Sequence, residues 1–323
     1  MSRISIAIFA AAAALLAVAS PSYAQQSWPN RAVKFIVPFG PGSGADIGAR
    51  LFAERLAAKW GKPVVVENRT GGDAIVAISA FVSANEDHTL LFAPTSTFTV
   101  HPYMHEKLPY QPADLNPIAK ISETVVAVTA NAGAGINSLK ELVARAKAEP
   151  GKLNAVAASG LTDFVFRGFL KENNLDIAMV PYRDITGALA DLAEGRIQIM
   201  MAAYAVSQPQ IQAGRVKALA VTNGTRAPNA PDVPTAVQAE VPSLAMDGLI
   251  GLFGPRSMAQ ELRQRVAADI AEVAKDPAIG TRLSSTAQIM GVTGPVEFAA
   301  AIDAQRAKVD SVARLLGMPR KVQ

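Results

Sequence analysis

Residues 34–46 read KFIVPFGPGSGAD, and this short stretch decides the fold. Its first part, Lys34 to Phe39, predicts a strand because it combines β-branched and aromatic residues. After the glycine turn, large apolar side chains recur every fourth residue from Phe52 to Trp60, which predicts a helix over residues 46–60. A strand, a glycine-rich turn and a helix in this order form the repeating unit of α/β folds.

The rest of the chain continues this alternation. Further strands are predicted at residues 63–67, 89–93, 125–129, 154–158, 178–182, 197–202 and 216–221. Further helices are predicted from the capping box Ser138 to Glu141 up to Pro150, at 162–173 and 185–194, from Ser257 to Asp276, and at 297–316. The fold class is therefore α/β with mixed, mainly parallel sheets, and we expect the last helix to pack back on the lobe that contains the N-terminal part.

The N-terminus predicts an export signal. Arg3 precedes an apolar run from Ile4 to Ala19, and Ser22-Tyr23-Ala24 provides small residues at a cleavage site before Gln25. The apolar run is shorter than the ~20 residues that a membrane-spanning helix needs. We therefore expect residues 1–24 to be a cleaved signal peptide and the remainder to be periplasmic. The remaining length suffices for two lobes, predicted as 25–125 plus 223–323 and as 126–222.

Composition argues against several classes of function. The net charge is only +4 and the charges are interspersed, so no basic stripe indicates a nucleic-acid partner. The chain has no cysteine, which removes disulfides, thiolate nucleophiles and cysteine-ligated metals. His88 is isolated, and Pro102 argues against a continuous helix that would align His101 with His105 as metal ligands. No Gly-x-Ser-x-Gly elbow of an esterase occurs, so we expect neither a metal nor another cofactor.

The glycine turn itself admits three interpretations. Backbone amides at the start of a helix stabilise anions, so residues 40–46 could bind a carboxylate or phosphate, or could be an ordinary connecting loop. A P-loop is disfavoured because the turn lacks lysine. A dinucleotide-binding turn is the enzyme alternative, since Glu67 follows Gly44 by 23 residues, but Ala45 replaces the last glycine of the motif. Export also separates the chain from cytosolic nicotinamide cofactors.

Read as a whole, the segment from Ile36 to Arg50 resembles the opening motif of the Bug proteins, the substrate-binding receptors of tripartite tricarboxylate transporters. Further landmarks of that family follow in the same order: Val64 to Arg69 with Gly71-Gly72, Leu108 to Tyr110, Asp114 to Ile118, Ala148 to Lys152, Val180 to Tyr182, Leu219 to Thr222 with Arg226, and Pro231 to Thr235. The resemblance implies a two-lobed, type II-like periplasmic binding protein. It also implies a monomer that closes over a small carboxylate and delivers it to membrane permease subunits.

The same resemblance implies a set of ligand-binding residues. In the first lobe these are Phe39, Gly40, Gly42, Ser43, Gly44, Ala45, Asp46, Thr95 and Ser96. In the second lobe they are Ser159, Gly160, Leu161, Thr162, Asp163, Tyr182, Arg183, Asp184 and Ala203.

Departures from the family pattern bear on the ligand. The loop that starts at Ser159 lacks the second glycine of the family, and an aromatic residue replaces the family's histidine. Asp163 adds a negative charge and Leu161 an apolar surface, which argues against a compact dicarboxylate held in the usual way. Arg183 could clamp a carboxylate, pair with Asp184 or face solvent. The carboxylate of Asp46 could contact the solute or stabilise its own helix. If Asp46 and Asp163 both face the cleft, a solute with hydrogen-bond donors is favoured. A periplasmic sensor for a signalling partner remains an alternative, because it would use the same fold.

Overall fold

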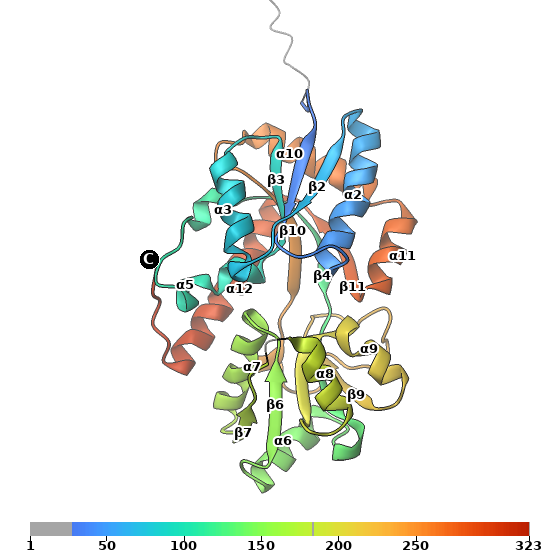
Figure 1. The fold of residues 1–323 in the computed structure, drawn as a ribbon, viewed down its shortest axis with the longest axis vertical. Coiled ribbons are helices and arrows are strands. Elements are labelled where there is room, and N and C mark those ends of the chain that lie inside the picture. Colours follow the sequence, from blue (N-terminus) through green and yellow to red (C-terminus); the bar gives the residue numbers. More distant parts are fainter. Residues whose placement is uncertain (1–27, 183, 323) are drawn as a thin grey trace, which may run out of the picture.

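A computed structural model describes residues 28–182 and 184–322. The predicted signal peptide and Arg183 lie outside these residues. The described chain forms two lobes, each built on a sheet with flanking helices (Figure 1). This arrangement confirms the predicted α/β class and the two-lobed architecture.

The first lobe contains a six-stranded sheet in the order β11-β4-β10-β3-β1-β2. Its strands are β1 (Val33–Val37), β2 (Val64–Asn68), β3 (Thr89–Pro94), β4 (Asn116–Thr124), β10 (Gly248–Gly254) and β11 (Gln288–Thr293). Its main helices are α2 (Gly44–Trp60), α3 (Ile75–Ala84), α10 (Gln260–Val273) and α11 (Pro277–Ser285). As predicted, the glycine turn joins a buried strand to a long helix, which Ser43 caps at its start and left-handed Gly61 ends.

The second lobe contains a five-stranded sheet in the order β7-β6-β8-β5-β9. Its strands are β5 (Val126–Asn131), β6 (Leu153–Ala157), β7 (Ile177–Met179), β8 (Ile199–Ala203) and β9 (Val216–Val221). Its helices are α6 (Leu139–Ala148), α7 (Leu161–Glu172), α8 (Ile185–Ala193) and α9 (Tyr204–Gln212). The predicted capping of α6 is confirmed by a bond of 3.1 Å from the Glu141 amide to Ser138 Oγ, although Glu141 itself accepts from the Asn137 amide.

Both sheets are mixed, as predicted, although parallel pairs do not predominate in either of them. The β1 strand pairs in parallel with β2 and β3, but β10 runs antiparallel to both β3 and β4. In the other sheet, β5 is antiparallel to β8 and β9. The antiparallel pairs arise because β4, β5, β9 and β10 carry the chain into and out of the second lobe. These strands are therefore not joined to their neighbours by the helical crossovers that make the strands of a βαβ unit parallel.

Two segments cross between the lobes and are tied together by one buried side chain. The first crossing is at Val125, between β4 and β5, and the second follows β9. Asn223 is fully buried, accepts from the Val126 amide at 3.2 Å and donates to the Thr124 carbonyl at 3.1 Å. These bonds hold the two crossing segments side by side.

The last helix, α12 (Pro295–Leu316), packs on both lobes (Figure 1). Phe298 and Ile302 belong to a core of the first lobe, whereas Val309 and Ala313 belong to the core of the second. The expectation that this helix packs back on the first lobe is therefore confirmed, but the helix packs on the second lobe as well.

Two short helices follow β3, α4 (Ser96–Thr99) and α5 (His101–Met104). The sequence predicts no continuous helix here, yet α5 makes one turn, in which the His105 amide donates to the His101 carbonyl at 3.0 Å. Pro102 is compatible with this turn because an amide at the start of a helix has no intrahelical acceptor.

Candidate functional site

A cavity of about 300 Å³ lies between the lobes. The first lobe contributes the end of β1, the turn before α3, and residues of α4 and α5, and the second lobe contributes the loop that leads into α7. The lining residues are Pro38, Phe39, Gly40, Thr70, Gly71, Asp73, Ala74, Ser96, Thr97, Val100, His101, Met104, Ser159, Gly160, Leu161 and Thr162.

The second-lobe wall is the N-terminal end of α7. Gly160 precedes the helix with a φ of +80°, and no side chain caps it. The first bond of the helix runs from the Phe164 amide to the Gly160 carbonyl at 3.1 Å, so the amides of Leu161 and Thr162 precede the internal bonding pattern. The positive end of the helix dipole therefore lies at the cavity, where it favours an anion.

The first-lobe wall includes an unusual turn, residues 71–74. All four residues have positive φ: +116° at Gly71, +55° at Gly72, +50° at Asp73 and +73° at Ala74. This conformation suits glycine but is uncommon for residues with a Cβ atom, so Asp73 and Ala74 are held in it by their surroundings.

The polar groups of the cavity are mostly uncharged. Hydroxyls come from Thr70, Ser96, Thr97, Ser159 and Thr162. Among the described residues that line the cavity, only Asp73 and His101 are titratable, and there is no lysine or arginine. An anion in this cavity would therefore be held by amides and hydroxyls, with one carboxylate nearby.

The structure brings seven of the predicted ligand residues to this cavity: Phe39, Gly40, Ser96, Ser159, Gly160, Leu161 and Thr162. The other described candidates do not line it: Gly42, Ser43, Gly44, Ala45, Asp46, Thr95, Asp163, Tyr182, Asp184 and Ala203. Arg183 is outside the described residues.

Asp46 is engaged in its own turn. Its side chain is nearly fully buried, accepts from the Gly42 amide at 2.9 Å and from Asn68 at 2.8 Å, and pairs with Arg50 at 2.9 Å. Burial alone raises the pKa of Asp46, but hydrogen bonds from Arg50, Gly42 and Asn68 outweigh it, so the pKa lies below its usual value. The carboxylate thus already occupies the Gly42 amide that an external anion would need.

Four other candidates are also bonded within the protein. Asp163 pairs with Arg167 at 2.7 Å, and Asp184 caps α8 through the Thr186 amide at 3.2 Å. The Tyr182 hydroxyl donates to Asp191 at 2.5 Å, and the Thr95 hydroxyl donates to Gln305 of α12 at 2.6 Å. These four side chains therefore make contacts that stabilise the protein itself.

Sequence reasoning missed part of the first-lobe wall: Thr70, Gly71, Asp73, Ala74, Val100, His101 and Met104. The Gly71-Gly72 pair was an available signal, since consecutive glycines mark a turn with positive φ. From sequence, His101 was considered only as a metal ligand, because Asp73, which lines the same cavity, lies 28 residues earlier in the chain.

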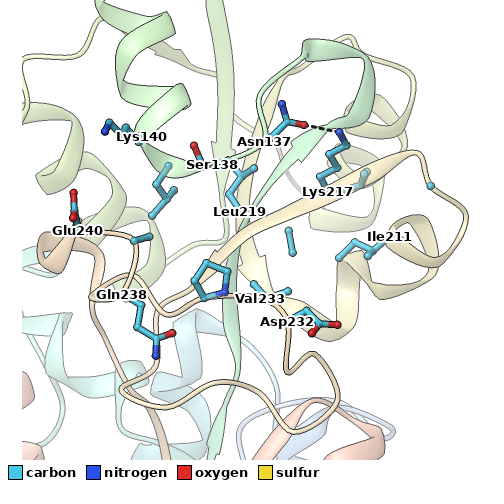
Figure 2. A pocket seen from close by; sticks show the side chains of 16 residues that line it. Asn137, Ser138, Lys140, Ile211, Lys217, Leu219, Asp232, Val233, Gln238 and Glu240 are labelled. Carbon is cyan, nitrogen blue, oxygen red and sulfur yellow. Dashed lines mark hydrogen bonds between the residues drawn. The ribbon is translucent and has the colours of Figure 1, made fainter.

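A larger groove, of about 790 Å³, lies outside this site (Figure 2). It follows the edge strand β9 and is bordered by the start of α6, the end of α9 and the loop 232–240. Lys217 reaches across its rim to Asn137, with a bond of 2.6 Å. None of the elements of the six-stranded sheet reaches this groove, so it differs in kind from the interlobe cavity.

The described residues include no group of three or more His, Cys, Asp or Glu side chains placed to hold a metal ion. Within the same residues, no helix has the length and apolar character needed to span a membrane.

The family profile described as "Tripartite tricarboxylate transporter family receptor" matches residues 48–297. The chain belongs to this family. It is therefore a solute-binding receptor of tripartite tricarboxylate transport, as the sequence resemblance implies. A UPF0065 protein from Bordetella bronchiseptica is 32% identical over 270 residues, which cover 83% of this chain and 80% of that protein.

Solved structures of similar receptors share the fold. MatC from Rhodopseudomonas palustris with bound malate is 25% identical, with a TM-score of 0.72 and coverage of 88% of this chain and 99% of that one. A second R. palustris protein, with adipate, is also 25% identical, with a TM-score of 0.75 and coverage of 90% and 99%.

Proposed function

We propose that this receptor captures a small carboxylate-bearing solute in the interlobe cavity, without converting it, and delivers it in the periplasm to the membrane permease subunits of its transporter. The observation that carries the proposal is the cavity itself, where the uncapped start of α7 faces hydroxyls from both lobes. The malate and adipate bound by similar receptors support a carboxylate ligand.

The carboxylate binds at the second-lobe wall. Leu161 and Thr162, whose amides precede the internal bonding pattern of α7, line this wall together with Ser159, and Ser159 and Thr162 carry hydroxyls. Hydrogen bonds to a charged group contribute about 1.5–3 kcal/mol each, so three of them provide much of the roughly 8 kcal/mol that a micromolar affinity requires. A basic side chain is not needed for such a site.

Asp73 determines what the rest of the solute must offer. A second carboxylate next to Asp73 would be repelled, so the other carboxylate of a dicarboxylate must lie away from Asp73, whereas a hydroxyl or amine next to Asp73 would donate to it. Asp46 and Asp163 do not line the cavity, so the idea that acidic residues favour a solute with donors now depends on Asp73. Direct contacts of Asp46, Asp163 or Arg183 with the solute stay predictions.

Binding closes the two lobes. We assign the lobes to residues 25–125 plus 223–323 and to residues 126–222, with crossings on either side of the bond network around Asn223. A solute that contacts both walls binds the closed form more tightly and so shifts the equilibrium towards it.

The dinucleotide alternative finds little support in the glycine turn. The amide of Gly42 is bonded to Asp46, and Glu67, which would bind a ribose in that interpretation, pairs with Lys34 at 2.9 Å. We therefore propose a binding protein with no enzymatic activity.

Calorimetric titration of the mature chain with malate, succinate and adipate tests the proposal. We expect binding of at least one of these acids, and tighter binding of malate than of succinate, because the two differ by one hydroxyl that can donate to Asp73. Thr162→Ala should weaken binding about ten-fold by removing a hydrogen bond to the carboxylate. Binding of NADH together with no response to any carboxylate would refute the proposal. Sequencing of the exported protein should begin at Gln25.

A further inference from the structure

A second cavity, of about 250 Å³, lies where α7, α12 and the segment between β9 and β10 meet. Leu161, the first residue of α7, lines both this cavity and the interlobe cavity, so the two cavities adjoin at its side chain. The last helix contributes Ala301, Ala304, Gln305 and Lys308. This space, the α12 cavity, is therefore where a solute too long for the interlobe cavity would extend.

The walls of the α12 cavity are mostly apolar. Leu161 and Val165 come from α7, and Met246 and Leu249 come from the segment that leads into β10 and from β10 itself. All four side chains are buried. Walls of this kind suit the methylene groups of a ligand.

Three polar side chains of the α12 cavity already have partners in the protein. The Thr222 hydroxyl donates to a backbone carbonyl at 2.9 Å. Gln305 accepts from the Thr95 hydroxyl at 2.6 Å and donates to the Asp247 carbonyl at 3.0 Å. The exposed side chain of Asp247 accepts from the Gly224 amide at 3.0 Å. These bonds maintain the shape of the cavity.

Lys308 is the cationic group of this cavity and is only partly partnered. Within the described residues, its Nζ donates to the carbonyl of Ala245, which lines the same cavity, and no carboxylate lies within 4.0 Å of it. An ammonium carries three donors, so two remain for a ligand. Burial lowers the pKa of Lys308, and the carboxylates of Glu172 and Asp247 offset only part of this effect. A partly buried ammonium without an ion pair is stabilised by an anion that enters beside it.

We propose that the α12 cavity is a subsite for the second acidic group of the solute, and that the ammonium of Lys308 binds this group. The assignment rests on the proposed binding of a first carboxylate at the start of α7. The methylene chain between the two groups then extends past Leu161, against the apolar walls. The second carboxylate also avoids Asp73, which lines the interlobe cavity and not the α12 cavity. The receptor therefore selects a long dicarboxylate over the monocarboxylate of the same length.

Adipate and hexanoate test the subsite, because they share a six-carbon chain and differ by the second carboxylate. By calorimetry, we expect wild type to bind adipate about ten-fold more tightly than hexanoate, since adipate gains a hydrogen bond between charged groups. Lys308→Met keeps an unbranched side chain but removes the ammonium, and we expect this variant to bind the two acids with nearly equal affinity. Equal weakening of both acids would overturn the proposal, because it would show that Lys308 only supports the segment at Ala245.

Lys171→Met is the matched control. Lys171 is an exposed residue in the last turn of α7, so this substitution removes the same charge from the surface outside the α12 cavity. The ten-fold preference for adipate should remain. Loss of the preference in this control as well would show that the net charge of the protein attracts the second carboxylate, and would overturn the proposal.

A structure of wild type with adipate gives a test that does not depend on the folding of a variant. One carboxylate should lie at the amides that begin α7, and the other should lie within hydrogen-bond distance of Lys308 Nζ. Both carboxylates in the interlobe cavity, or binding of malate but of neither six-carbon acid, would overturn the subsite and leave the proposed function intact. Failure to bind adipate, hexanoate and malate would count against the proposed function and the subsite together.

Discussion

Replacing Asp46 with asparagine distinguishes a residue that builds the glycine turn from one that contacts the solute. The carboxylate accepts from Gly42, Arg50 and Asn68, and its side chain is only 3% exposed. Asparagine has the same shape but presents an NH2 group to donors, so at least one of these bonds becomes a clash between donors.

The magnitude follows from the geometry. Breaking a fully buried ion pair costs about 3–5 kcal/mol, but the Arg50 side chain is half exposed and can return to water. We therefore expect Asp46→Asn to lower the free energy of unfolding by about 2 kcal/mol. Urea denaturation of the solute-free protein at pH 7 measures this loss, and it should appear as a lower midpoint at an unchanged slope.

Acid should reduce the difference between wild type and variant. Since the folded-state pKa of Asp46 is lowered below its usual 3.8, its contribution to stability is complete above that value and is lost as the pH falls through the lower, folded-state pKa. The matched control is Asp163→Asn, because that carboxylate pairs with half-exposed Arg167 on a helix surface and should contribute under about 1 kcal/mol. Unchanged urea stability combined with weaker solute binding in Asp46→Asn would refute the structural role.

Three further predictions concern packing and the crossing segments. Gly168→Ala should lower the thermal midpoint, with a cost of about 1–3 kcal/mol, because the added methyl would lie 2.8 Å from Val312 of α12. Gly187→Ala meets no atom within 4 Å in α8 and should instead raise the midpoint slightly through higher helix propensity; equal shifts in both variants would contradict the close approach of α7 to α12. Asn223→Ala should cost about 1–3 kcal/mol in urea unfolding because it removes the partner of the Val126 amide and of the Thr124 carbonyl in the first crossing segment, and an unchanged midpoint would show that this bridge is dispensable.

Local signals account for the correctly predicted elements. The caps at Ser43 and Ser138 act on amides three residues away, and β1 and α2 are specified by the residues within them. The strands β4, β10 and β11 were not predicted from sequence, and they are antiparallel members of the first-lobe sheet. Their pairing depends on the path of the chain between the lobes, which no short window of sequence contains.

The site was predicted only in part for a similar reason. The resemblance to the Bug family located the loop Ser159 to Thr162, whose residues are adjacent in the chain. The carboxylate of Asp46 admitted two interpretations from sequence, and its hydrogen bond from the distant residue Asn68 supports the structural one. His101 and Asp73 line the same cavity only because the α5 segment folds against the turn before α3, where His105 lies 3.8 Å from the Asp73 carboxylate.

By itself, the sequence determined the βα alternation, the two-lobed family and the segment that begins α7, because these depend on neighbouring residues or on an ordered set of motifs. Tertiary structure alone decided that Asp73, and neither Asp46 nor Asp163, provides the carboxylate of the cavity. It also decided that α12 packs into the cores of both lobes. The physical reason is that the environment of a charge or an apolar face is set by residues far away in the chain, whose approach is specified only when the whole core packs.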